Sequence, residues 1–163
     1  HQATSEALHV TRDFAKIFNF ALIYLGDDST LAHAIGTGDT DMVRQMRRRW
    51  EDSFPQAAQW ITVQQLEGLR TGYVETLYGR KVPLPLDMGE RHVRSCAVNY
   101  PIQGTAAEIF KIYMLALAPL LPVIRLQVHD ELLITGRQAI PPGLEDLTPV
   151  GVPLNVEYLE RWG

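Results

Sequence analysis

The sequence predicts an α+β fold, in which helices fill the first part of the chain and hairpins and further helices follow. Apolar residues recur every three or four positions over residues 6–25, as on the buried side of a helix. Strand-like patterns appear over residues 71–85 and 125–134, and each has a polar turn at its centre. Helices and antiparallel hairpins in one chain define the α+β class.

Composition excludes several classes of protein. The 163 residues are 46% apolar and 21% charged, as in globular proteins, and no apolar run reaches the roughly 20 residues that span a membrane. The net charge of −4 argues against a surface that binds nucleic acid everywhere, although residues 42–94 carry nine Arg or Lys against six Asp or Glu. The single cysteine, Cys96, excludes an internal disulfide, so we expect a cytoplasmic protein.

The predicted helix over residues 6–25 has two distinct sides. Its expected buried residues are Phe14, Ile17, Phe18, Ala21, Leu22 and Leu25. Arg12, Lys16, Phe20 and Tyr24 are each four residues apart and form one stripe. Cations suit phosphates and aromatic rings suit a sugar or base, so the stripe predicts a nucleoside triphosphate site. The alternative is a boundary stripe whose cations lie along the surface and whose rings join the core.

Two further helices are expected over residues 27–68. The first is capped by the Asp27 to Thr30 segment and ends near Gly36. The second is kinked or split at Pro55. Its expected buried residues are Met42, Met46, Trp50, Phe54, Ile61 and Leu66. Its outer side carries Arg44, Arg47, Arg48 and Arg49. These arginines indicate a solvated face, with a DNA contact as the alternative.

A hairpin with a glycine turn is predicted over residues 71–85. A helix then ends near Asn99, which is expected to cap a new helix with Pro101 in its first turn. Gln103 follows, and its amide could donate to acceptors in the DNA minor groove. The alternative is that Asn99 is only a cap and Gln103 is only solvated.

The hairpin predicted over residues 125–134 carries His129, Asp130 and Glu131 at its tip. Carboxylates at the end of a stiff element could hold a hard divalent cation. Taken alone, the same tripeptide is also compatible with a solvated turn. Residues 136–149 are expected to form a loop with at most one helical turn, and residues 152–158 a last strand of the same sheet.

Four motifs, taken in chain order, resemble those of family A DNA polymerases, the class of bacterial DNA polymerase I. The finger-helix pattern of that family matches Arg12, Lys16, Asn19, Phe20 and Tyr24. Its Gly-Tyr-Val-x-Thr-x-x-Gly-Arg hairpin matches residues 72–80, its Asn-x-Pro-Ile-Gln-Gly-Thr-Ala-Ala helix matches residues 99–107, and its Gln-Val-His-Asp-Glu hairpin matches residues 127–131. The resemblance runs from about Thr11 to Trp162 and implies finger helices with the C-terminal part of an antiparallel palm sheet.

The resemblance also implies roles. Primer-template DNA and a dNTP would be the partners, and Asp130 and Glu131 would hold catalytic Mg²⁺. Arg12 and Lys16 would grip the triphosphate, and Lys16 would assist the leaving pyrophosphate. Phe20 would pack near the sugar, and Tyr24 would stack at the template side of the new base pair. The residues expected to contact DNA are Arg94, Asn99, Gln103 and His129.

The sequence departs from the family pattern at several places. The family's other catalytic aspartate and its thumb are absent, so we expect a second polypeptide or an N-terminal segment to supply them. The family's arginine falls on Ser95, with Arg94 one position early, and Leu25 separates Tyr24 from Gly26. We therefore expect one partial polymerase domain over residues 1–163, with finger helices over 1–70 and the hairpin, DNA-tracking helix and palm hairpin over 71–163. The alternative is a non-catalytic, polymerase-derived module that binds DNA, nucleotide or another protein.

Overall fold

The computed structural model describes residues 1–24 and 27–161, and the chain divides into two compact units. The first unit is His1–Gln103 and the second is Gly104–Gly163, so the division falls inside α6 (Glu90–Ala116). Helices alternate with two-stranded antiparallel sheets, which confirms the α+β class. Among the described residues, no helix is long and apolar enough to cross a membrane.

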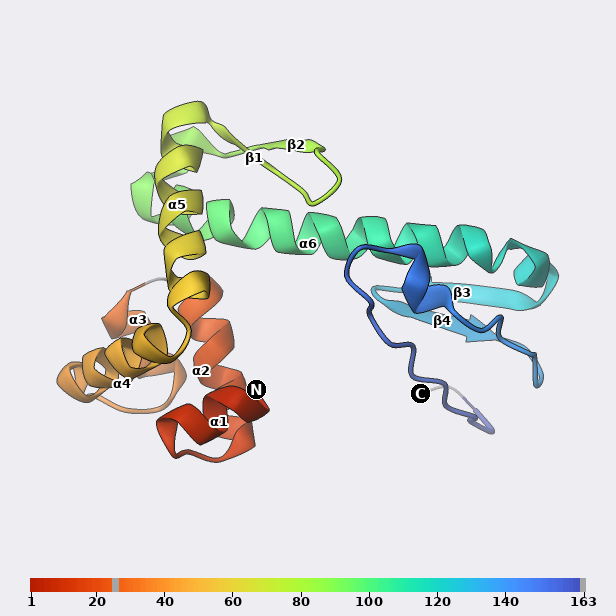
Figure 1. Cartoon of the computed structure of the whole chain (residues 1–163), viewed down its shortest axis with the longest axis horizontal. Coiled ribbons are helices and arrows are strands. Elements are labelled where there is room, and N and C mark those ends of the chain that lie inside the picture. Colours follow the sequence, from red (N-terminus) through yellow and green to blue (C-terminus); the bar gives the residue numbers. More distant parts are fainter. Residues whose placement is uncertain (25–26, 162–163) are drawn as a thin grey trace. The chain divides into compact units, whose positions relative to one another are not determined.

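The first unit begins with four helices that enclose an apolar core (Figure 1). They are α1 (Gln2–Leu8), α2 (Arg12–Tyr24), α3 (Asp28–Ala34) and α4 (Thr40–Ser53). Phe18, Leu31 and Val43 are fully buried at its centre. The Asp27 carboxylate accepts the Thr30 backbone N–H at 2.7 Å, which confirms the predicted cap of α3.

Pro55 splits the long helix predicted before residue 68. The second half, α5 (Pro55–Thr71), begins at this proline, where a missing backbone N–H costs nothing. Gly72 ends α5 with a φ of 78°, a left-handed conformation that suits glycine. The predicted hairpin follows as β1 (Tyr73–Glu75) and β2 (Lys81–Pro83), with η1 (Leu86–Met88) after it.

The hairpin β1–β2 and the start of α6 share a second core in the first unit. Val74 and Leu84 from the hairpin segment pack with Val93 and Ala97 of α6. Gly68 of α5 also lies here, and a side-chain carbon at this position would come within 2.8 Å of Ala97 and Leu84. The absence of a side chain at Gly68 therefore allows α5 to approach α6 closely.

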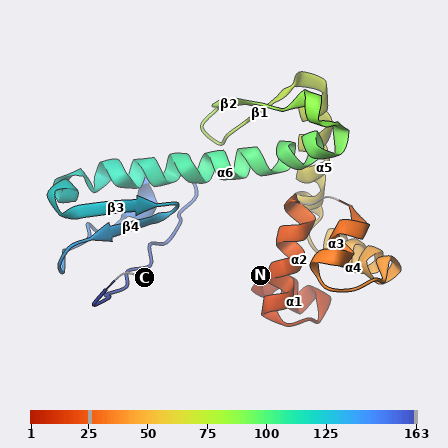
Figure 2. The ribbon, with the colours of Figure 1, turned by 180° about the vertical axis from the view of Figure 1, so that it is seen from behind.

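The second unit contains the later turns of α6 and the predicted central hairpin (Figure 2). Its other elements are η2 (Ala118–Val123), β3 (Ile124–Val128), β4 (Glu131–Ile134) and η3 (Leu144–Leu147). Ile109 and Tyr113 of α6 pack with Leu117, which follows that helix, and with Leu144 in its core. The hairpin and the loop with one helical turn are confirmed.

The prediction of one continuous helix over residues 6–25 is wrong. The chain forms two helices, because His9 takes a left-handed φ of 53° and ends α1. The Thr11 hydroxyl then accepts the Phe14 backbone N–H at 3.3 Å at the start of α2. A hydroxyl cap competes with the helical pattern at this point.

The helix boundary predicted at Asn99 is also wrong, because α6 continues through Pro101. A proline inside a helix removes one hydrogen bond and costs about 3 kcal/mol. Here Pro101 is buried, and α6 packs into a core on each side of it, through Ala97 and through Ile109. Packing therefore outweighs the local preference, and Asn99 is not a cap.

The last predicted strand does not form. Residues 151–159 have no regular secondary structure and are exposed, and Pro153 lacks the N–H that a ladder needs. Three residues expected in the core are exposed instead, namely Ile17, Met42 and Leu66. The predictions for Leu25, Gly26 and Trp162 lie outside the described residues.

Candidate functional site

The predicted stripe on α2 lies on an accessible side of the helix; we call Arg12, Lys16, Phe20 and Tyr24 the α2 ridge. Arg12 and Lys16 are exposed, Phe20 is 43% exposed and Tyr24 is half-buried. The Phe20 and Tyr24 rings stack with centroids 5.7 Å apart and planes 20° apart. Phe20 does not join the core, which contradicts the boundary-stripe alternative.

The opposite side of α2 explains why the α2 ridge faces outward. Phe18 is fully buried there, and Asn19 beside it bonds to two other helices. The Asn19 amide nitrogen donates to the Thr4 hydroxyl of α1 at 3.0 Å. The Asn19 amide oxygen accepts the Trp50 indole N–H of α4 at 3.1 Å. These bonds fix the rotation of α2 about its own axis.

The sequence-predicted DNA residues Asn99 and Gln103 lie on α6, and the structure brings Gln103 to the α2 ridge. The Gln103 amide nitrogen donates to the Tyr24 phenol oxygen at 3.2 Å. Gln103 remains exposed, whereas Asn99 is half-buried. The Asn99 side-chain oxygen is buried and has no hydrogen-bond partner among the described residues.

Two more residues of α6 contact the segment around the end of α2. The Ser95 hydroxyl donates to the Tyr24 backbone carbonyl. Arg91 donates to the Thr30 hydroxyl and pairs with the Asp27 carboxylate at 2.7 Å. The last carbonyls of a helix have no partner within the helix, so the Ser95 contact satisfies an otherwise free acceptor.

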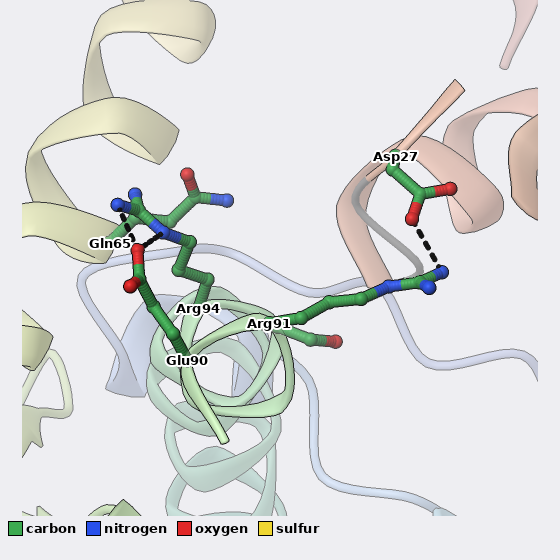
Figure 3. A pocket seen from close by; sticks show the side chains of 6 residues that line it. Asp27, Gln65, Glu90, Arg91 and Arg94 are labelled. Atoms are coloured by element: carbon green, nitrogen blue, oxygen red, sulfur yellow. Dashed lines mark hydrogen bonds and ion pairs between the residues drawn. The ribbon is translucent and has the colours of Figure 1, made fainter. Parts of the chain in front are cut away.

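A cavity of about 340 Å³ lies beside these contacts (Figure 3). It is lined by Asp27, Gln65, Glu90, Arg91, Arg94 and Ser95. Figure 3 shows Arg91 reaching toward Asp27 and Arg94 lying beside Gln65. Arg94 pairs with Glu90 at 2.7 Å, so each arginine that lines the cavity faces a carboxylate. Because these charges balance, the cavity does not favour the binding of an anion or of a cation.

Asp27 has the most distinctive electrostatics of the cavity. The Thr30 backbone N–H that it accepts holds its pKa below the ordinary value of 3.8. The hydroxyls of Thr30 and Ser29 and the charge of Arg91 lower this pKa further. The carboxylate is therefore ionised when it caps α3 and pairs with Arg91.

The acidic hairpin tip belongs to the second unit. Val128 of β3 pairs with Glu131 of β4, so His129 and Asp130 form a two-residue turn. His129 has a φ of 52°, a positive value that tight hairpin turns need at this position. All three predicted residues of the tip, His129, Asp130 and Glu131, are exposed.

The two carboxylates of this hairpin tip suit part of a magnesium site. Asp130 in the turn and Glu131 at the start of β4 offer the hard oxygen donors that Mg²⁺ prefers. In the part of the chain that the structure describes, no group of three or more His, Cys, Asp or Glu side chains could hold a metal ion. Mg²⁺ in phosphate-binding proteins is usually held by one or two carboxylates with substrate oxygens and water. The pair therefore fits the protein's share of such a site.

The chain belongs to DNA polymerase family A, because the model of that family matches residues 1–145. Its relatives include the thermostable DNA polymerase I of Thermus thermophilus, which is 36% identical over 90% of this chain. DNA polymerase I of Deinococcus radiodurans is 37% identical over 90% of the chain, and that of Geobacillus stearothermophilus is 32% identical over 97%. The chain covers 17–20% of the length of these three proteins. The predicted family is confirmed.

A solved structure has the same fold. It is the POL domain of Pol1 from M. smegmatis, in complex with DNA primer-template and dNTP. The TM-score is 0.74, and the match covers 94% of this chain and 32% of that one at 24% sequence identity. This similarity confirms the predicted polymerase fold of the α+β chain.

Sequence reasoning missed the residues that hold the α2 ridge in place. Asn19 was matched only as part of a motif, and Arg91 and Ser95 had no predicted contact with α2. A signal was present, because Arg91, Ser95, Asn99 and Gln103 are each four residues apart and share one side of a helix. The predicted break at Asn99 concealed this row.

Proposed function

We propose that this chain is the C-terminal part of a template-directed DNA polymerase, which transfers a nucleotidyl group from a dNTP to a primer 3′-OH. The observation that supports the proposal most is the accessible α2 ridge. Its two cations are followed along one side of α2 by two stacked aromatic rings. A triphosphate along this ridge would meet Arg12 and Lys16 first and the rings of Phe20 and Tyr24 afterwards.

In the proposed reaction, the primer 3′-oxygen forms a bond to the α-phosphorus of the dNTP. The bond between the α-phosphorus and the bridging oxygen breaks, and pyrophosphate leaves with the electron pair. The 3′-OH passes its proton to water, and the Lys16 ammonium donates a proton to the leaving pyrophosphate and regains one from water. Arg12 neutralises phosphate charge through two parallel N–H donors, which an ammonium cannot supply.

Asp130 and Glu131 are the proposed metal-binding residues. When bound, Mg²⁺ ions supply charge neutralisation at the attacking and leaving oxygens. We propose that a second polypeptide or an N-terminal segment contributes the remaining carboxylate and a thumb. The family resemblance supports this part of the proposal, as does the number of carboxylates at the hairpin tip, because two Mg²⁺ ions need more than Asp130 and Glu131.

The proposed DNA contacts are Arg94, Asn99, Gln103 and His129. Gln103 is exposed on α6, and its contact with Tyr24 uses one amide N–H, which leaves the carbonyl oxygen and the second N–H able to contact DNA. A minor-groove contact through these groups is compatible with any sequence, because every base pair presents an acceptor there. A polymerase needs this tolerance.

Binding of a primer-template and a dNTP at increasing salt tests the proposal. Lys16→Ala should weaken dNTP binding about tenfold, as loss of a charge-assisted contact does. The matched control is Lys81→Ala, because this lysine does not belong to the α2 ridge. Its ammonium lies 4.5 Å from the centre of the Tyr73 ring in the β1–β2 hairpin. DNA affinity should fall steeply with salt, because phosphate contacts release counterions. Salt-independent binding, or equal dNTP affinity of both variants, would contradict the proposal.

A further inference from the structure

Tyr24 is held at both of its ends by one helix. Its backbone carbonyl accepts the Ser95 hydroxyl, and its phenol oxygen accepts the Gln103 amide N–H at 3.2 Å. Ser95 and Gln103 are eight residues apart on α6, which corresponds to about 12 Å along the helix axis. Two such anchors restrict both the position of the last turn of α2 and the direction of the Tyr24 ring.

Tyr24 needs this support because core packing does not provide all of it. Its ring is only half-buried, and its stacking partner Phe20 is 43% exposed. The residue is also the last of α2, where backbone hydrogen bonds within the helix run out. Contacts from outside the helix therefore decide where the ring lies.

Ser95 stands where the family resemblance implies an arginine. An arginine side chain is long and carries its donors on a charged fork, whereas a serine hydroxyl stays close to its own helix. The short side chain here reaches the Tyr24 carbonyl. The neighbouring arginine, Arg94, is paired with Glu90 and does not replace this contact.

We propose that Ser95 and Gln103 are positioning residues for Tyr24, and that they hold its ring in the orientation in which a nucleobase stacks on it. The stacking role rests on the proposed polymerase function. Gln103 has a second consequence, since its other amide N–H and its carbonyl can contact DNA while the first N–H remains on Tyr24. Gln103 thereby links contact with the duplex to the orientation of the Tyr24 ring.

Fluorine NMR of the whole chain, labelled with 3-fluorotyrosine, tests the positioning directly and needs neither DNA nor nucleotide. The chain has six tyrosines, and Tyr24→Phe identifies the resonance of Tyr24. Ser95→Ala and Gln103→Ala should each shift the Tyr24 resonance, and Ser95→Thr should restore it because threonine keeps the hydroxyl. The matched control is Ser53→Ala, since the Ser53 hydroxyl donates to a carbonyl of its own helix.

The outcomes separate this inference from the proposed function. An unchanged Tyr24 resonance in both Ser95→Ala and Gln103→Ala would overturn the positioning role. Gln103 is exposed, so its replacement tests the inference even where Ser95→Ala fails to fold. Shifted resonances in a chain that binds no dNTP would support the positioning role and contradict the polymerase. In a chain that binds dNTP on a primer-template, Ser95→Ala should weaken that binding and Ser95→Thr should not.

Discussion

At the scale of single residues, Asn19 joins three helices through one side chain. It lies on α2, donates to Thr4 of α1 and accepts from Trp50 of α4. Thr4 and Trp50 are both buried, so neither can turn to water when its partner is lost. The orientation of the α2 ridge therefore depends on a residue that is not part of it.

Asn19→Ala should lower the free energy of unfolding by about 1–3 kcal/mol, because the Trp50 N–H is left buried without an acceptor. Urea unfolding followed by tryptophan fluorescence measures the change. Asn155→Ala is the matched control, since Asn155 is exposed and bonds only to Glu157 in the described structure. Equal stability of the two variants would show that the Asn19 contacts contribute little.

The lowered pKa of Asp27 predicts how the stability of the first unit changes in acid. Its pKa is lowered in the folded chain, so the folded state binds this proton more weakly than the unfolded state. The stability that the Asp27 carboxylate contributes is thus present above about pH 3.8 and is lost as the pH falls through its lower folded-state pKa.

Circular dichroism between pH 5 and about pH 2 should therefore show less acid-induced loss of helix in Asp27→Asn than in the unmodified chain, because asparagine caps α3 without titrating. Asp27→Ala should cost about 1 kcal/mol at neutral pH through loss of the cap. Asp87→Asn is the control, since Asp87 is exposed on η1. An acid response of Asp27→Asn identical to that of the unmodified chain would refute the assignment.

At the scale of elements, the crossing of α5 and α6 depends on one glycine. Replacing a glycine inside a helix by alanine usually stabilises the helix by about 0.5–1 kcal/mol. Gly68→Ala should instead destabilise the fold, because the added methyl group would lie 2.8 Å from Ala97 and Leu84 in the core shared with the hairpin.

Gly68→Ala should lower the melting temperature and cost about 1–3 kcal/mol, as overpacking of a core does. Gly38→Ala is the matched control, because a methyl group there would contact none of the described residues within 4 Å beyond its chain neighbours. Calorimetry measures the melting temperatures of both variants. A melting temperature raised by Gly68→Ala would mean that the two helices can separate at little cost.

Local chemistry explains which elements the sequence predicted. Both hairpins, the Asp27 cap and the split at Pro55 rest on turn, capping and proline signals that act over a few residues. The break at His9 and the continuity of α6 through Pro101 were not predicted, because packing and a left-handed residue decide them. The α2 ridge was predicted by its four-residue spacing. Its anchors on α6 share a four-residue row, but they lie 71 and 79 residues away in sequence, and no local signal links that row to α2.

At the scale of the whole molecule, the proposed polymerase needs residues from both units. The α2 ridge belongs to the first unit, and the carboxylates Asp130 and Glu131 belong to the second. In the proposed function, the ridge residues would bind the nucleotide and the hairpin residues would bind the metal. Removal of either set should therefore abolish primer extension, and removal of the hairpin carboxylates should leave nucleotide binding without metal largely intact.

Primer extension with dNTPs and Mg²⁺ tests the account most directly. The chain is assayed alone and with a purified N-terminal part of a family A polymerase, and Asp130→Ala is compared with Asp87→Ala, an exposed aspartate on η1. The account predicts extension only in the combined sample, unchanged in Asp87→Ala and reduced about a thousandfold or more in Asp130→Ala. Extension by the chain alone, or Asp130→Ala indistinguishable from the unmodified chain in every combination, would contradict it.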